Sequence, residues 1–116
     1  MENGTVLQKS VGFSVRIVNL YKYLTGEKKE HIMSRQVLRS GTSIGANIAE
    51  AQRGQSRADF AAKMSIALKE ASETEYWLCV LQRTDYISQV QHDSLYADLA
   101  ELLRMLTAIC KKTNEK

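Results

Sequence analysis

Three glutamates in the middle of the chain, Glu50, Glu70 and Glu73, are the side chains best placed to do chemistry. Carboxylates on facing helices, combined with Glu-x-x-His pairs, hold di-iron centres in helix bundles. The chain has no Glu-x-x-His, and its two histidines, His31 and His92, lie near the expected starts of helices. We therefore expect no metal, no cofactor and no catalytic residue among these acids.

Nucleophilic catalysis is also not indicated. Ser40 and Ser43 lie on a predicted helix with no histidine at a helical spacing from them, so no serine–base pair is suggested. Cys79 and Cys110 stand in the apolar runs WLCVL and LTAIC, a context typical of reduced core thiols. Since the chain also contains no glycine-rich phosphate loop, we expect a protein that is not an enzyme.

A polar stripe follows the second predicted helix, where small hydroxyl and amide side chains recur at steps of three and four. Glu70 and Glu73 lie beside the apolar edge of the third helix, where a carboxylate must find hydrogen-bond donors or lose hydration. Asn47, Ser43 and Arg39 on the second helix are the expected donors. The spacing predicts a polar network that either sets the helix register or pairs subunits, made of Ser40, Ser43, Asn47, Glu50, Glu70 and Glu73.

A second stripe on the same helix consists of small residues, Gly41, Gly45 and Ala49, at steps of four. Each glycine inside a helix costs about 1 kcal/mol relative to alanine, so a close contact should compensate. Small residues at this spacing allow another backbone to approach closely. That backbone belongs either to a helix of the same chain or to a second subunit, and the sequence favours neither.

Arginines give the second helix an uneven charge. Residues 32–58 contain four arginines and one acid, whereas residues 59–87 contain five acids and three cations. Arginine binds phosphate by bidentate hydrogen bonds. The hypothesis is a nucleic-acid contact, and the simpler alternative is a solvated face; the residues concerned are Arg35, Arg39, Arg53 and Arg57.

These side chains must be positioned by helices. The chain has 116 residues, 44% of them hydrophobic and 25% charged, with no proline and six glycines. Apolar periodicity predicts helices over about 5–24 and 29–53, a third from a Ser56 cap to 83, and a fourth that begins between 88 and 93. Gly26 and Gly54 are expected to end the first two helices in a left-handed conformation.

Four such helices with short connections predict an all-α fold, an antiparallel up-down four-helix bundle, as one domain over residues 1–116. No apolar run approaches the roughly 20 residues that span a membrane. The first thirty residues lack the apolar core of a signal peptide. We therefore expect a cytoplasmic protein with no membrane contact.

The run from Gln36 to Glu50, QVLRSGTSIGANIAE, followed by Asp59-Phe60 and then ALKEASETEYWL over 67–78, resembles the bacterial 23S rRNA intervening-sequence family. The resemblance implies an up-down bundle that assembles into homopentameric rings. It also implies a relation to the accessory proteins of diversity-generating retroelements, basic pentamers that partner a reverse transcriptase and bind nucleic acid. The motif residues carry over as fold and interface residues, and none as catalytic.

Two functions are compatible with these observations. The first is a non-enzymatic, homopentameric scaffold that associates with structured RNA or with a nucleic-acid–protein complex, since a ring would multiply the potential of the arginine face. The alternative is a protein–protein interaction module with no nucleic-acid role. The acidic third helix and the tyrosines that are expected to be exposed favour this alternative.

Overall fold

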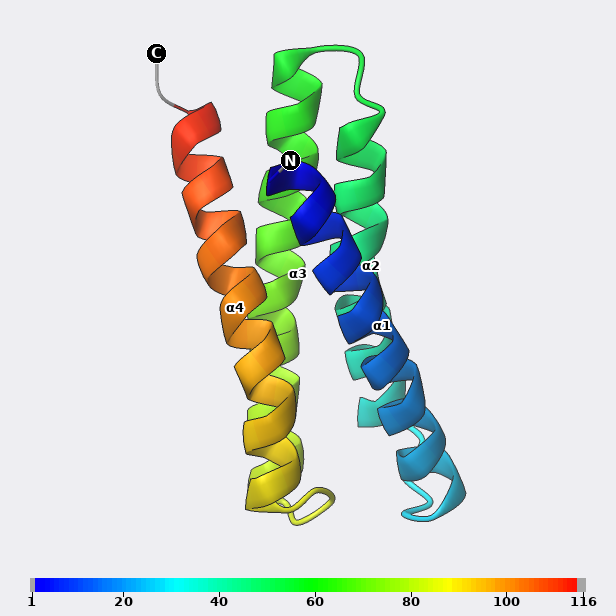
Figure 1. Cartoon of the computed structure of the whole chain (residues 1–116). Helices are drawn as coiled ribbons and strands as arrows, with labels where there is room; N and C mark the ends of the chain where they lie inside the picture. The colour runs from blue at the N-terminus through cyan, green and yellow to red at the C-terminus, as the bar shows by residue number, and fades with distance from the viewer. Residues whose placement is uncertain (1, 115–116) are drawn as a thin grey trace.

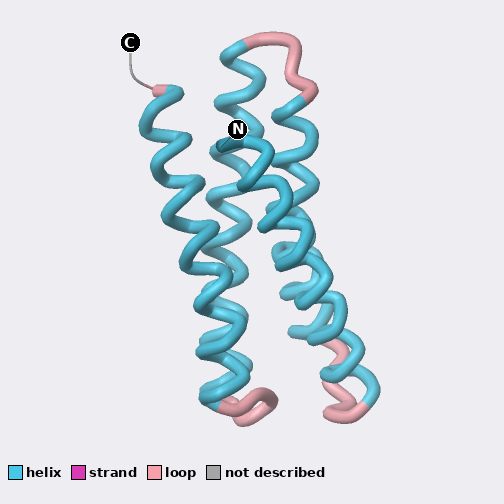
Figure 2. The backbone as a smooth tube through the Cα atoms, viewed as in Figure 1, coloured by secondary structure: helices cyan, strands magenta, loops and turns pink. Residues whose placement is uncertain are grey.

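The computed structural model describes residues 2–114, with side chains from residue 4 onward, and consists of four helices joined by short loops (Figures 1 and 2). Within this range there is no strand, which confirms the all-α prediction. The domain predicted over 1–116 includes residues 1, 115 and 116, which lie outside the described range. The helices are α1 (Glu2–Gly26), α2 (Met33–Gln52), α3 (Arg57–Arg83) and α4 (Gln89–Thr113).

The helices pack in the order of the chain. α2 lies between α1 and α3, and α3 packs against α4. Of the four helix pairs that are in contact, α1 and α4 pack together least. In Figure 1 the chain turns back at each loop, so the α2–α3 loop lies at the end of the bundle where α1 begins and α4 ends. The other two loops lie at the opposite end. One continuous apolar core runs between the helices, and its largest members include Phe13, Ile17, Ile44, Leu78 and Leu99.

Side-chain caps define the starts of α3 and α4. The Ser56 hydroxyl accepts a hydrogen bond from the backbone N–H of Asp59 at 3.0 Å, which confirms the predicted cap. Ser88 and Gln91 form a reciprocal capping box at the start of α4. These caps satisfy backbone donors that have no partner within the helix.

The start of α2 differs from the expectation. The helix begins at Met33 rather than near Lys29, because the buried Glu30 carboxylate caps it from the loop. It accepts from the backbone N–H groups of Ile32, Met33 and Ser34, the last at 2.7 Å. Burial alone would raise the pKa of Glu30, but these three bonds outweigh it and hold the pKa below its ordinary value.

The prediction that Gly26 and Gly54 end their helices in a left-handed conformation is wrong. No glycine among the described residues has a positive φ; instead Lys29 (φ 56°) and Asp85 (φ 67°) take the left-handed region. Gly26 is the last residue of α1. A Cβ at Gly54 would lie 3.1 Å from the Ala51 carbonyl oxygen, a tight contact that glycine avoids.

None of the four helices is long and apolar enough to cross a bilayer, a finding that covers the described residues.

Candidate interaction site between α2 and α3

The polar interface between α2 and α3 is organised around Arg39. Its Nη1 lies 2.7 Å from Glu70 Oε2, and its Nη2 lies 2.5 Å from Glu73 Oε2. The indole Nε1 of Trp77 donates to the same Glu73 oxygen at 3.1 Å. One guanidinium therefore bridges two carboxylates on successive turns of α3, and the second carboxylate orients a tryptophan.

The charges of this cluster stabilise one another. Hydrogen bonds to Glu70, and then to Glu73, raise the pKa of Arg39. The hydrogen bond from Arg39 lowers the pKa of Glu73. Partial burial raises this pKa, and the hydrogen bond from Trp77 lowers it further. The Glu70 side chain is only 13% exposed, compared with 50% for Arg39. The charged forms of Arg39 and Glu73 are therefore favoured, in a cluster that is partly desolvated.

A buried pair of hydroxyls lies beneath this cluster. Ser40 Oγ and Thr74 Oγ1 are 2.9 Å apart, and both residues are fully buried between α2 and α3. The Thr74 hydroxyl also lies 2.8 Å from the carbonyl oxygen of Glu70. Because the two hydroxyls form a hydrogen bond inside the core, they favour one alignment of α2 along α3.

The structure brings together only part of the predicted polar network. Ser40, Glu70 and Glu73 join α2 to α3, as described above. Ser43 and Asn47 instead bond to carbonyl oxygens of their own helix, at 2.6 and 2.8 Å. Glu50 also joins the two helices, because it pairs with Lys63 Nζ of α3 at 3.1 Å.

Sequence reasoning missed Thr74 and Lys63 as members of this interface. Thr74 lies on the apolar face of α3, and a polar residue at such a position is a detectable signal. The pairing of Lys63 with Glu50 depends on the register of the two helices, which the sequence pattern does not define.

Two large exposed side chains of α3, Ile66 and Tyr76, lie about one helical turn before Glu70 and one after Glu73. Ile66 is 43% exposed and Tyr76 is 60% exposed. The rings of Tyr76 and Trp77 meet edge to face with their centroids 5.1 Å apart. Trp, Tyr and Arg are the residues enriched at protein interfaces. We call this surface the α2/α3 patch and define it as Arg39, Ile66, Glu73, Tyr76 and Trp77.

The small-residue stripe packs largely within the chain. A Cβ on Gly41 would lie 2.8 Å from both Cγ atoms of Ile17 on α1. A Cβ on Gly45 would lie 3.1 Å from Ser10 Oγ, also on α1. Ala49, the third member of the stripe, is exposed. The two glycines thus allow α1 to approach α2 closely.

The four arginines are not gathered in one place. Arg39 is engaged by Glu70 and Glu73, and Arg35 lies near the start of α2, roughly 27 Å of helix away from Arg53 at 1.5 Å per residue. Arg53 caps the end of α2 and Arg57 begins α3, so these two flank the same loop.

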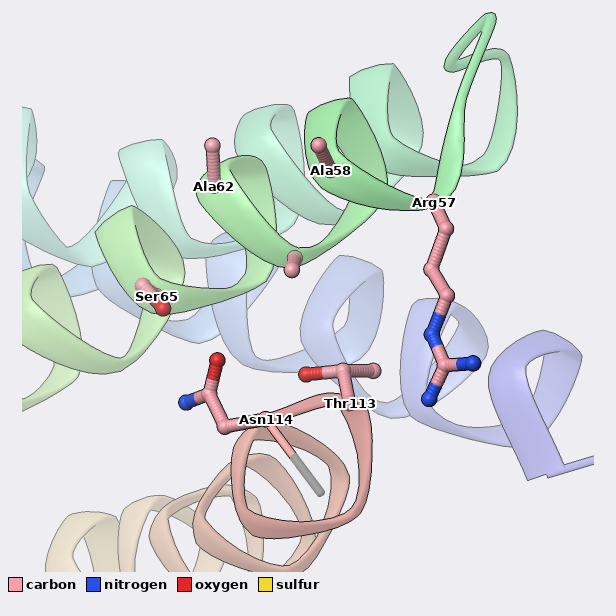
Figure 3. Close-up of a pocket in the computed structure, with 7 residues that line it drawn as sticks. Arg57, Ala58, Ala62, Ser65, Thr113 and Asn114 are labelled. Carbon is pink, nitrogen blue, oxygen red and sulfur yellow. The ribbon is translucent and has the colours of Figure 1, made fainter. Parts of the chain in front are cut away.

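A shallow groove lies beside that loop, between the start of α3 and the end of α4 (Figure 3). Arg57 and Ser65 contribute polar atoms from α3, and Thr113 and Asn114 contribute them from the end of α4. Alanines of α3 line the remainder. Within residues 2–114, no three His, Cys, Asp or Glu side chains converge in a way that could hold a metal.

These features define a class of protein, a small four-helix bundle whose polar and aromatic surface is suited to interaction. The match to a family model is consistent with this class: residues 2–108 match the family of 23S rRNA-intervening sequence proteins. The chain belongs to that family.

A solved structure supports the assignment. The chain is similar to a protein of unknown function from the S23 ribosomal protein family of Bacteroides thetaiotaomicron, with 58% sequence identity and a TM-score of 0.94. The match covers 96% of this chain and 99% of the other. No curated protein sequence matches the chain.

Proposed function

We propose that the chain is a non-enzymatic, cytoplasmic, up-down bundle that assembles into a homo-oligomer, a pentameric ring, and acts as a scaffold for structured RNA. The observation that supports assembly most directly is the α2/α3 patch. Its arginine and tryptophan are already held in place by Glu73, so little side-chain entropy is lost when a partner covers them.

The RNA part of the proposal has different support. The family takes its name from the intervening sequence of 23S rRNA, and the chain has a net charge of +3. A relation to the accessory proteins of diversity-generating retroelements, as the sequence resemblance implied, belongs to the same proposal. A cyclic assembly would repeat each local basic surface and so increase the attraction for a polyanion.

Assembly is tested by sedimentation equilibrium of the wild type and of two variants that each place a negative charge in the patch, Ile66→Glu and Tyr76→Glu. We expect the wild type to have five times the chain mass of 13.1 kDa and both variants to dissociate. The matched control is Val90→Glu on α4, because Val90 is 78% exposed and lies outside the patch. A monomeric wild type would contradict assembly. An oligomer that persists in both glutamate variants would show that this patch is not the subunit interface.

A second function, a protein–protein interaction module without a nucleic-acid role, is favoured by the exposed Ile66 and Tyr76 of the same patch. Affinity capture distinguishes the two functions. Recovery of one stoichiometric protein that resists nuclease treatment would favour the module. Loss of all captured partners after nuclease treatment would favour the RNA scaffold.

A further inference from the structure

Apolar side chains lie outside the core on the outer surface of α1 and α2. Val11 and Val15 are one turn apart on α1, and they are 54% and 56% exposed. On α2, Ala46 and Ala49 are exposed as well. We call this surface the α1/α2 face and define it as Val11, Val15, Val18, Thr42, Ala46 and Ala49.

The packing of α1 against α2 places these residues on one side of the helix pair. Gly45 of α2 packs against Ser10 and Ser14 of α1. Each exposed valine follows one of these serines by one position, and Ala46 follows Gly45. One position along a helix is a rotation of about 100°, and the chain turns back between α1 and α2 (Figure 1). The valines and the alanine therefore turn outward on the same side.

The α1/α2 face is uncharged. None of its six residues is ionisable, and its one hydroxyl, from the threonine, donates to a carbonyl oxygen of its own helix at 2.7 Å. Lys22 and Arg35 lie beyond one end of the face, and Arg53 lies beyond the other. At the edge towards α3, Arg39 and Glu50 are paired with residues of α3. The centre of a protein–protein interface is depleted in charged residues in the same way.

The α2/α3 patch has complementary properties. Arg39 and Glu73 pair with each other inside the patch, so a partner does not have to supply a countercharge. The patch also carries large side chains, since Tyr76 is 60% exposed and its ring meets that of Trp77. The α1/α2 face carries alanines and β-branched residues instead. Small residues on one surface accept large side chains from the other, as in a packed core.

We propose that the α1/α2 face of one subunit binds the α2/α3 patch of the next subunit. This proposal rests on the homo-oligomer proposed above and identifies the partner of its patch. A cyclic ring needs two different surfaces on each subunit, because a contact between identical surfaces closes a dimer. Both surfaces border α2, so closure of the ring places α2 of every subunit nearest to the rotation axis.

The test is sedimentation equilibrium of two full-length variants, Val15→Glu, which breaks the face, and Tyr76→Glu, which breaks the patch. Every contact between identical variant subunits then lacks one of its two surfaces, so each variant alone should have the mass of one chain, 13.1 kDa. In an equimolar mixture, the intact patch of the first variant can bind the intact face of the second. We expect the mixture to form a complex of two chains, which cannot close into a ring.

The matched control is Val90→Glu, which places the same charge on an exposed valine of α4 and should keep the wild-type mass. A wild-type mass for Val15→Glu would overturn the role of the face and leave assembly intact, whereas a monomeric wild type would contradict assembly itself. A mixture that remains at the mass of one chain would show that the two surfaces do not bind each other. Should Val15→Glu lose helix by circular dichroism, Ala46→Glu on α2 takes its place and should also be monomeric.

Discussion

The α2–α3 interface and the α1–α4 interface use the same kinds of polar side chain in different surroundings. Between α2 and α3, Arg39 bridges two glutamates above a buried pair of hydroxyls. α1 and α4 pack together least of the helix pairs in contact, and Arg16 contacts Asp98 and Ser94 at the surface between them. A groove opens beside that contact, lined by residues of both helices that include Tyr23 and Val90.

The difference shows that burial, rather than the number of ion pairs, decides what a polar contact contributes. The pair Lys9–Glu101 has side chains 41% and 44% exposed, whereas Glu70 is 13% exposed. Exposed pairs contribute about 0–1 kcal/mol, and removing one partner of a desolvated pair costs more. We therefore expect α2–α3 to hold the bundle together and α1–α4 to open first.

The largest effect is expected from Thr74→Val, a change of similar shape in the α2–α3 interface. It leaves the buried Ser40 hydroxyl without its partner and should lower the free energy of unfolding by about 2 kcal/mol in urea titrations. The double variant Ser40→Ala/Thr74→Val should recover part of this loss. The control Thr107→Val, at an exposed position of α4, should stay within about 0.5 kcal/mol of wild type.

Arg39→Ala is expected to have the next largest effect. It leaves Glu70 and Glu73 on successive turns without their cation, and should cost about 1–2 kcal/mol of unfolding free energy. The same urea titration measures it. A variant as stable as wild type would show that the cluster contributes no stability.

The pH dependence of stability sharpens the same point. Because Arg39 lowers the pKa of Glu73 in the folded state, that glutamate stabilises the fold above its unfolded pKa of about 4.5. This contribution should be lost as the pH falls through the lower, folded pKa. Urea unfolding of wild type and Arg39→Ala from neutral pH down to acid should show a weaker decline for the variant, and parallel curves would disprove the coupling.

The smallest effect is expected between α1 and α4. A double-mutant cycle with Arg16→Ala and Asp98→Ala should give a coupling energy of about 0.2–1 kcal/mol, which falls at high salt. The matched cycle with Arg39→Ala and Glu70→Ala should give the larger value. If the two cycles are equal, burial is not the cause of the difference between the interfaces.

Much of the fold could be predicted because it depends on local pattern. Apolar periodicity gave the four helices, and Ser56 with Asp59 gave the start of α3. The start of α2 could not be predicted from such a pattern. Glu30 lies within an apparently helical run, but its side-chain carboxylate accepts from three backbone N–H groups and caps the helix.

The candidate site was less predictable. Arg39 is one of three donors that the sequence suggests for Glu70 and Glu73, and the structure joins it to both glutamates. The pairing of Ser40 with Thr74 requires the register of two helices. The groove between the start of α3 and the end of α4 depends on how the whole bundle packs, which the sequence pattern does not define.

The most direct test of the account is binding of the wild-type protein to a structured RNA, titrated from low to physiological salt, with the oligomer mass measured in the same buffers. We predict a stable multiple of the chain mass that binds with micromolar or tighter affinity and weakens steeply with salt. Absence of binding at low salt by an intact oligomer would contradict the RNA scaffold and leave a protein-interaction module.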